Sequence, residues 1–115
     1  MKNQPLQLLI MELKKTSIEK DVKLWKRIAK ELEGPTSKRR VVNLSRINKY
    51  SKNNDTVIVP GKVLSMGNLN KKVTIAAYNF SKSALQKINS SGSKAISINE
   101  LVKQNPKGSK VRIIG

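Results

Sequence analysis

Basic side chains gather in one short stretch of the chain, PTSKRRVVNLSRINKY at residues 35–50. Three of the five arginines, Arg39, Arg40 and Arg46, fall within eight residues, with Lys38 and Lys49 beside them. No acidic residue lies in the stretch, so we expect nothing nearby to neutralise it. A planar guanidinium can donate two hydrogen bonds to a phosphate or carboxylate, whereas a lysine acts as a point charge. The stretch therefore predicts the most geometrically specific anion contact in the sequence.

Catalytic chemistry has few candidate residues in this chain. Cysteine and histidine are both absent, which excludes thiol nucleophiles, imidazole bases, disulfides and the usual zinc sites. Of the seven carboxylates, Glu100 belongs to a helix-capping pattern and Asp55 to a turn, while the other five share residues 1–33 with eight basic residues. The sequence contains no glycine-rich phosphate loop. We therefore expect no enzymatic activity, no metal site and no cofactor.

Charge is unevenly distributed along the chain, whose formal net charge is +17. Residues 1–33 hold eight basic and five acidic residues, whereas residues 34–115 hold sixteen basic and two acidic ones. Such an excess repels itself unless a polyanion surrounds it, and nucleic acid is the leading candidate. A module that binds acidic proteins is an alternative, but it does not explain why lysines occur in every predicted loop.

Basic residues in these loops alternate with asparagine, serine and glycine. Amides, hydroxyls and backbone N–H groups are, like basic side chains, common partners of phosphate and ribose oxygens. The basic candidates are Lys38, Arg39, Arg40, Arg46, Lys49, Lys52, Lys71, Lys72, Lys82, Lys94, Lys107 and Lys110. The polar and glycine candidates are Asn43, Ser45, Asn48, Ser51, Asn68, Asn70, Ser81 and Gly108.

The kind of nucleic acid is indicated by the scarcity of aromatic residues. Single-strand binders usually stack bases on several aromatic rings, but this chain has four aromatic residues, and Trp25 and Phe80 lie in apolar patterns typical of a core. A helix-turn-helix reader of DNA would have to use the first two helices, which hold most of the acids. Structured RNA, recognised by shape and phosphates, fits better. A basic DNA-binding architectural or regulatory protein is the alternative.

Two amphipathic helices are predicted at the start of the chain, packed as a hairpin on the core. The first begins at Pro5 and ends near Lys15, and the second is capped by Asp21 and ends at Gly34-Pro35. Their apolar positions are Leu6, Leu9, Ile10 and Leu13, then Val22, Trp25, Ile28, Ala29 and Leu32. A third, short helix is predicted after Asn43 as its cap, with Arg46 and Lys49 facing outward.

Short strands alternate with short helices beyond residue 55. The predicted strands are TVIVP, ended by Pro60-Gly61 and followed by the segment KVL and a turn, then KKVTIAAYNF, AISI and KVRII. Ser81 is predicted to cap one helix, and Ser97 with Glu100 forms a capping box for another, which ends at Asn105-Pro106. The fold class is therefore α/β, with N-terminal helices followed by an irregular unit of short strands and helices.

The length of 115 residues favours one domain. Within it we expect a helical hairpin at residues 1–34, a basic RNA-contacting segment at 35–55 and an α/β core at 56–115. The longest uninterrupted apolar run, Leu8 to Met11, is too short for a secretory signal or a membrane span. The cytoplasm is the predicted location, and no membrane partner or small-molecule substrate is expected.

Several segments together resemble a known family. RRVVNLSRINKY, TVIVPGKVL, KKVTIAAYNFS and NPKGSKVRIIG are similar, in this order, to the archaeal and eukaryotic large-subunit ribosomal proteins of the L-eighteen-e family, within the L-fifteen/L-eighteen-e superfamily. The likeness covers about Leu6 to Gly115. It implies an irregular ββα superhelix preceded by helices. It also implies a non-catalytic role in the ribosome: binding folded ribosomal RNA and holding RNA and neighbouring large-subunit proteins together.

The resemblance also implies particular RNA-facing positions. These are Arg39, Arg40, Asn43, Arg46, Lys62, Ser81, Lys82, Gly108 and Arg112. The chain departs from the family where Ser65 and Ser93 replace glycines, so the close-backbone role there falls to Gly67 and Gly92. With the loop lysines Lys38, Lys49, Lys71, Lys72 and Lys110, these positions form the predicted RNA-binding set.

Overall fold

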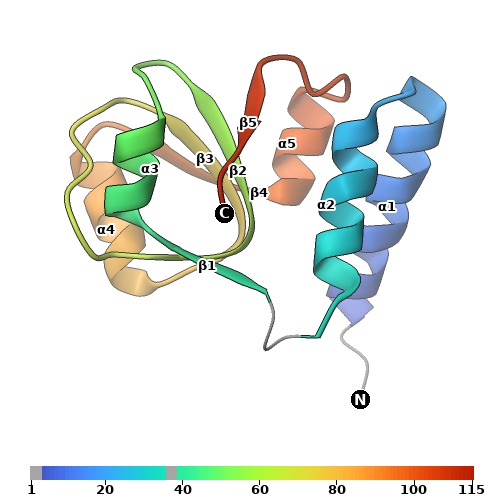
Figure 1. The fold of residues 1–115 in the computed structure, drawn as a ribbon, viewed down its shortest axis with the longest axis horizontal. Coiled ribbons are helices and arrows are strands. Elements are labelled where there is room, and N and C mark those ends of the chain that lie inside the picture. Colours follow the sequence, from blue (N-terminus) through green and yellow to red (C-terminus); the bar gives the residue numbers. More distant parts are fainter. Residues whose placement is uncertain (1–3, 36–38) are drawn as a thin grey trace.

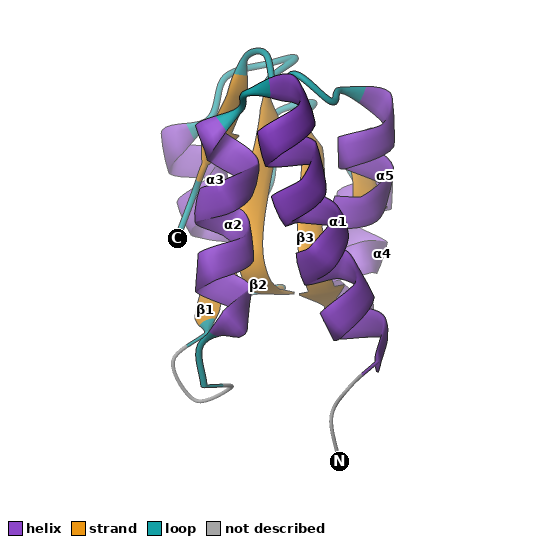
Figure 2. Ribbon diagram, turned by 90° about the vertical axis from the view of Figure 1, so that its right-hand side faces the viewer, coloured by secondary structure: helices purple, strands orange, loops and turns teal. Residues whose placement is uncertain are grey.

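The computed structural model describes residues 4–35 and 39–115 and places a β-sheet between two layers of helices (Figure 1). On one side of the sheet lie α1 (Gln4–Lys20), α2 (Lys23–Glu33) and α5 (Ile98–Gln104), and on the other lie α3 (Leu44–Tyr50) and α4 (Lys82–Ser90). Figure 2, turned toward the hairpin, shows α1 and α2 side by side in front of the sheet. The expected fold class, N-terminal helices followed by strands and helices, is confirmed.

Every pair of neighbouring strands in the described residues is parallel. Its strands are β1 (Arg40–Asn43), β2 (Thr56–Leu64), β3 (Thr74–Phe80), β4 (Lys94–Ser97) and β5 (Val111–Ile113). The order is β1-β2-β3-β4, and β5 also pairs with β2. β5 pairs with the first three residues of β2 and β1 with its last four. Because β3 occupies the other edge of β2, β5 and β1 lie one after the other along the same edge.

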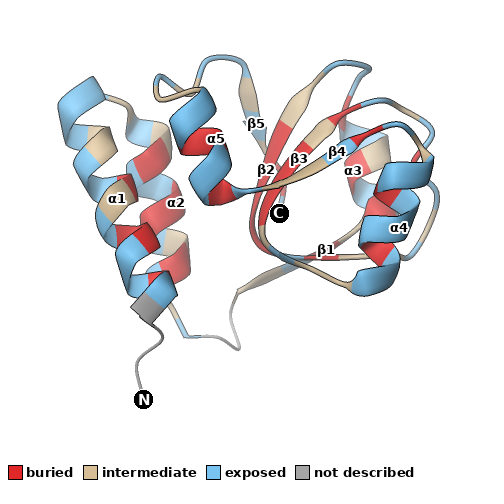
Figure 3. Cartoon of the chain, turned by 180° about the vertical axis from the view of Figure 1, so that it is seen from behind, coloured by how far each residue is buried: buried red, intermediate tan, exposed pale blue. Residues whose placement is uncertain are grey.

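Apolar side chains form two buried clusters, one on each face of the sheet (Figure 3). Alternate residues of a strand point to opposite faces, so Ile58 joins α1, α2 and α5, whereas Val57 and Val59 join α3 and α4. Trp25 is fully buried in the first cluster, and its Nε1 donates a hydrogen bond to the carbonyl oxygen of Pro106 at 2.6 Å. This contact ties the hairpin to the loop that precedes β5.

Several local predictions are confirmed. The apolar positions predicted for the hairpin helices are buried, except for Val22, which is half-buried against the same cluster. The Ser81 hydroxyl accepts a hydrogen bond from the Ala84 N–H at 3.1 Å, and Ser97 with Glu100 forms the predicted capping box. Such patterns involve residues three or four positions apart, so the sequence alone can reveal them.

The boundaries of the hairpin helices differ from the prediction. α1 continues past Lys15 to Lys20, so its last turns lack the apolar spacing that indicated the first ones. Asp21 is not the cap of α2: its φ is 54°, and Val22 occupies the N-cap position. The Val22 N–H donates to the Ser17 carbonyl at 3.0 Å, and the Ser17 hydroxyl donates to the Val22 carbonyl at 2.8 Å. These two hydrogen bonds hold the turn that a capping carboxylate was expected to hold.

The predicted strand end at Pro60-Gly61 is also wrong, because β2 continues through both residues to Leu64. The pairing with β3 shifts register between Val59 and Lys62, which marks a bulge. Gly61 pairs with Arg40 of β1, and a Cβ at Gly61 would overlap the Arg40 carbonyl oxygen. The glycine therefore permits close strand approach rather than ending the strand. The strand β1 itself was not predicted, since residues 35–55 were interpreted as a basic segment with a short helix.

Candidate nucleic-acid interface

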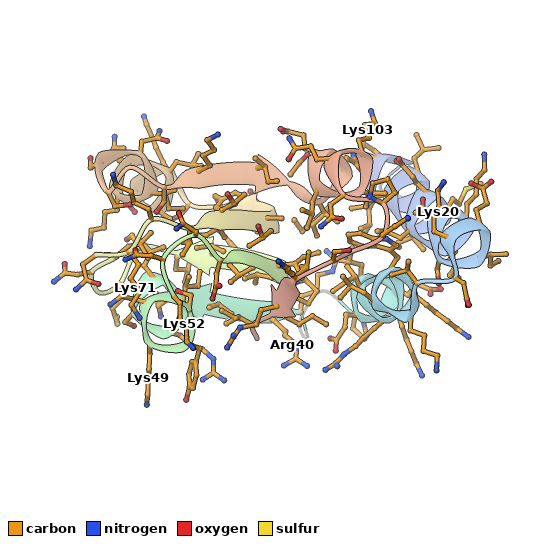
Figure 4. The ribbon with its side chains drawn as sticks, turned by 90° about the horizontal axis from the view of Figure 1, so that it is seen from above. Lys20, Arg40, Lys49, Lys52, Lys71 and Lys103 are labelled. Carbon is orange, nitrogen blue, oxygen red and sulfur yellow. The ribbon has the colours of Figure 1, made fainter. Side chains whose placement is uncertain are left out.

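The predicted RNA-binding residues lie at several places around the sheet rather than in one cluster. Some lie along the edge formed by β1 and β5, some at the ends where the strands begin, and some at the ends where the strands finish. In Figure 4, Arg40, Lys49, Lys52 and Lys71 lie toward one side of the molecule, and Lys20 and Lys103 lie toward the other.

Arg39 and Arg40 both contact the end of α2. Arg39 donates from Nη2 to the Leu32 carbonyl at 3.4 Å, and its guanidinium lies 5.3 Å from the centre of the Tyr78 ring. Arg40 Nη2 is 3.0 Å from Glu31 Oε1. The expectation that nothing nearby neutralises this stretch is therefore wrong for Arg40. β1 begins beside the last turn of α2, which brings the acid of one element to the arginine of the other.

Arg46 lies apart from the other two arginines, on the exposed side of α3. Its guanidinium and the Nζ of Lys49 each lie 5.3 Å from the centre of the Tyr50 ring. From β5, Arg112 Nη1 donates to the Tyr50 carbonyl at 3.2 Å, and its Nε is 4.0 Å from Asp55 Oδ2. We call Arg46, Lys49, Tyr50 and Arg112 the α3–β5 cluster. Its members come from α3 and β5, two elements that lie far apart in the sequence.

The neighbouring lysines Lys71 and Lys72 have different surroundings. Lys71 Nζ donates to the carbonyl oxygens of Asn48 and Ser51, the latter at 2.6 Å, at the C-terminal end of α3. A lysine in this position satisfies carbonyl groups that have no partner within the helix. Lys72 is exposed and, with Lys94 and Gly92, lines an open hollow of about 270 Å³ where β3 and β4 begin. The structure thus gives Lys71 an internal partner and leaves the Lys72 side chain at the surface.

A third group lies where β2 and β3 end. Lys62 is exposed and in register with Val41 of β1 and Asn79 of β3. Ser81 is the N-cap of α4, and Lys82 is exposed at its first position. These residues present two lysines beside the positive end of a helix dipole.

The remaining predicted residues have mainly local surroundings. Asn43 occupies the predicted N-cap position of α3, but its Oδ1 accepts from the Met66 N–H at 3.2 Å and makes no capping hydrogen bond. Gly108 has a φ of 63°, and a Cβ there would lie 2.9 Å from Leu24 Cδ2, so packing explains the glycine. Lys110 is exposed, with a φ of 59°. Lys38 lies outside the described residues.

The two serines that replace expected glycines both make side-chain hydrogen bonds. Ser93 is buried, and its Oγ accepts from the Val73 N–H at 3.0 Å and donates to the Lys71 carbonyl at 2.8 Å. Ser65 Oγ accepts from Ser83 Oγ at 2.9 Å. A glycine could make neither contact, so both serines fasten turns that a glycine would leave to the backbone alone.

The fold and the charge of the surface define a class of protein. The chain is a small mixed α/β protein, strongly basic outside its helical hairpin. Within residues 4–35 and 39–115 no group of acidic side chains is placed to hold a metal ion. No described helix is long and apolar enough to cross a membrane. The mixed α/β fold and the excess of basic residues outside the hairpin thus define a small basic protein.

Comparison with known proteins identifies the family. The family model for ribosomal protein 60S L18 and 50S L18e matches residues 2–115, so the chain belongs to this family. The large ribosomal subunit protein eL18 of Methanoregula boonei is 49% identical over 112 residues, which cover 97% of this chain and 93% of that protein. The eL18 proteins of Methanosphaerula palustris and Methanococcus maripaludis are 47% and 43% identical, over 97% and 92% of this chain and 93% and 88% of theirs.

Membership of the family confirms four of the predictions made from the sequence. The family resemblance was correct, and a ribosomal protein of the large subunit has a structural role and no enzymatic activity. The location is the ribosome, in the cytoplasm.

Proposed function

We propose that this protein stabilises folded large-subunit ribosomal RNA through contacts to phosphate and ribose oxygens. The observation that carries the proposal is the uncompensated charge of residues 39–115. Their two acids, Asp55 and Glu100, both have local partners: Asp55 Oδ2 accepts from the Lys52 N–H at 2.8 Å, and Glu100 closes its capping box. Most exposed lysines of this region therefore lack an acidic partner, which suits a surface covered by phosphates.

The spread of these cations favours RNA over DNA. They occur along the β1–β5 edge and at both ends of the strands, so a ligand that contacts them all must bend around the protein. Folded ribosomal RNA presents phosphates on several sides of a bound protein, whereas a straight duplex contacts one face. The hairpin helices also turn their apolar stripes into the core and mix acids with lysines, which disfavours them as a pair of DNA-reading helices. Other proteins of the large subunit are the proposed neighbours.

Cosedimentation tests the proposal directly. The purified protein should remain with large ribosomal subunits after a high-salt wash, and it should bind naked large-subunit ribosomal RNA in a filter assay. With roughly 8 phosphate contacts, affinity should fall on the order of 10³-fold or more between 50 and 200 mM salt. Indifference to this RNA even in dilute buffer would refute the proposal.

Competition separates RNA from the DNA alternative. An excess of duplex DNA should displace the protein from ribosomal RNA only weakly. Equal displacement by DNA and by unlabelled ribosomal RNA would favour the DNA-binding alternative. Because Arg39 and Arg40 also contact α2, Arg46→Ala is a cleaner probe of the basic stretch than a change of all three arginines.

A further inference from the structure

Tyr50 differs from the other aromatic residues in its exposure. Trp25 is fully buried, Phe80 is half-buried against the second cluster, and Tyr78 is half-buried with Arg39 over its ring. Tyr50 has a relative exposure of 46% and is the large aromatic side chain at the surface within the described residues. In a chain with so few aromatic residues, an exposed ring among cations needs an explanation.

The surroundings of Tyr50 form a site with three kinds of contact. An open depression of about 320 Å³ is lined by Arg46, Tyr50, Arg112 and residues 113–115. The half-buried Ile113 supplies apolar surface, the Tyr50 ring and Arg46 guanidinium supply planar groups, and Arg112 supplies a second guanidinium. The volume is at the lower end of the range for small-ligand sites, roughly 300–1,000 Å³.

The two arginines are held differently. The Arg112 guanidinium is oriented by the Tyr50 carbonyl and by Asp55, so it is positioned before any ligand arrives. Arg46 makes no hydrogen bond to a described residue, and its contact is with the Tyr50 ring. Its five N–H donors are therefore available to a ligand, and its plane can stack on a second flat group.

A ligand that uses all three contacts is flat, aromatic and anionic. We propose that the α3–β5 cluster binds one unpaired nucleotide of an RNA, with its base against Tyr50 and Arg46 and its phosphate at Arg112. A base within a duplex is covered on both faces by its neighbours, so the nucleotide must be turned out of its helix or lie in a loop. This inference rests on the proposed function and adds one specific subsite to it.

Variants of Tyr50 test the stacking contact. Tyr50→Ala should lower affinity for large-subunit ribosomal RNA roughly 5- to 100-fold, as expected when a base loses an aromatic partner. Tyr50→Phe keeps the ring and should bind like the wild type. Because the Arg112 contact uses the Tyr50 backbone carbonyl, neither variant removes it. Circular dichroism should show both variants folded, since the side chain lies at the surface.

Photochemical crosslinking locates the nucleotide. Short-wave ultraviolet irradiation of the complex, followed by digestion and mass spectrometry, should yield a nucleotide adduct on the peptide that contains Tyr50. Chemical probing of the complex should show that the crosslinked base is unpaired. Arg46→Lys keeps the charge but loses the planar guanidinium. It should therefore lower the yield of the Tyr50 adduct and leave the salt dependence of binding nearly unchanged.

The outcomes separate this inference from the function on which it rests. Wild-type affinity for ribosomal RNA with no adduct at Tyr50 and no effect of Tyr50→Ala would overturn the nucleotide site and leave RNA binding intact. A base-paired crosslinked nucleotide would overturn it as well. Failure of the wild type to bind the RNA at all would refute the proposed function itself.

Discussion

The molecule has two regions, the hairpin formed by α1 and α2 and the sheet unit of residues 39–115. They contain similar numbers of basic residues per residue of chain, but they differ in how many acidic residues accompany them. In the hairpin, Lys14 lies 3.1 Å from Glu33 and Lys15 lies 3.9 Å from Glu19. The sheet unit has two acids, both with local partners. The two regions therefore differ in their ratio of basic to acidic residues, and the excess of basic residues is larger in the sheet unit.

The hairpin's ion pairs are not what hold it in place. Both pairs are largely exposed, and exposed pairs contribute about 0–1 kcal/mol each. The buried stripe of Trp25, Ile28, Ala29 and Leu32 against the sheet contributes far more, because apolar burial dominates folding. The hairpin is therefore mainly a packing element, and the sheet unit is the proposed binding element.

Removing the contact between the two regions should have the largest effect. Trp25→Ala should lower the free energy of unfolding by about 3–5 kcal/mol, because a fully buried indole is lost. Urea denaturation followed by far-ultraviolet circular dichroism measures the loss. Leu8→Ala, at an exposed position of α1, should change it by less than about 0.5 kcal/mol. A separate early transition in Trp25→Ala would mean that the two regions unfold independently, against the prediction of one domain.

Gly61→Ala should be the most damaging small change in the sheet unit. The added methyl group overlaps the Arg40 carbonyl oxygen, so β1 must move away from β2. We expect a loss of about 3 kcal/mol, at the upper end of the range for overpacked sites. Gly34→Ala is the matched control, since a Cβ there meets its nearest atom at an ordinary 3.6 Å. Equal denaturation midpoints for the two variants would contradict the role assigned to Gly61.

Removing the same number of positive charges from each region tests the comparison most directly. Four exposed lysines of the sheet unit and four of the hairpin are changed to glutamine in two separate variants. The sets are Lys62, Lys72, Lys82 and Lys94, and Lys20, Lys23, Lys26 and Lys30. The sheet-unit variant should lose roughly 10- to 100-fold in RNA affinity, and its salt slope should become less steep by roughly 3. Similar losses for the hairpin variant would remove the distinction between the regions.

Adjacent lysines sharpen the comparison within the sheet unit. Lys71→Met removes two hydrogen bonds at the end of α3 and should lower stability by about 1–2 kcal/mol. Lys72→Met should leave stability within about 0.5 kcal/mol and weaken RNA binding instead. Thermal unfolding and filter binding of both variants decide between these roles. A stable Lys71→Met variant with weakened RNA binding would return Lys71 to the binding set.

The smallest effect is expected where the two regions share an ion pair. Glu31→Gln should lower stability by less than about 1 kcal/mol, because the pair with Arg40 is partly exposed. The loss should shrink as salt rises. Calorimetry at two salt concentrations, with Glu33→Gln as the comparison, measures it. A loss that persists in high salt would show that Arg40 is held by more than charge.

Local patterns of the sequence predicted much of the fold. Contacts between residues far apart in the sequence were not predicted. The stripe of α2 and the caps at Ser81 and Ser97 depend on residues within one helical turn, so spacing reveals them. β1 was missed because it is four residues long and contains an exposed Val41 rather than an apolar alternation. A Pro-Gly pair usually ends a strand. β2 accommodates Pro60-Gly61 because a bulge shifts its pairing with β3 and because β1 packs closely against Gly61.

The candidate site divides in the same way. The basic character of the surface and the prominence of Arg46 followed from composition and spacing. The separation of Lys71 from Lys72, and the meeting of Arg46 with Arg112, depend on how α3 packs beside β5 and the loop before β3. No local rule in the sequence contains that information.

Trp25 offers an optical consequence of its position between hairpin and sheet. It is the sole tryptophan of the chain, shielded from solvent and bonded through its indole N–H to Pro106. Its emission should be blue-shifted in the native protein and move to longer wavelengths when the hairpin detaches. The chain thus carries an intrinsic fluorophore that reports docking of its N-terminal helices without any label.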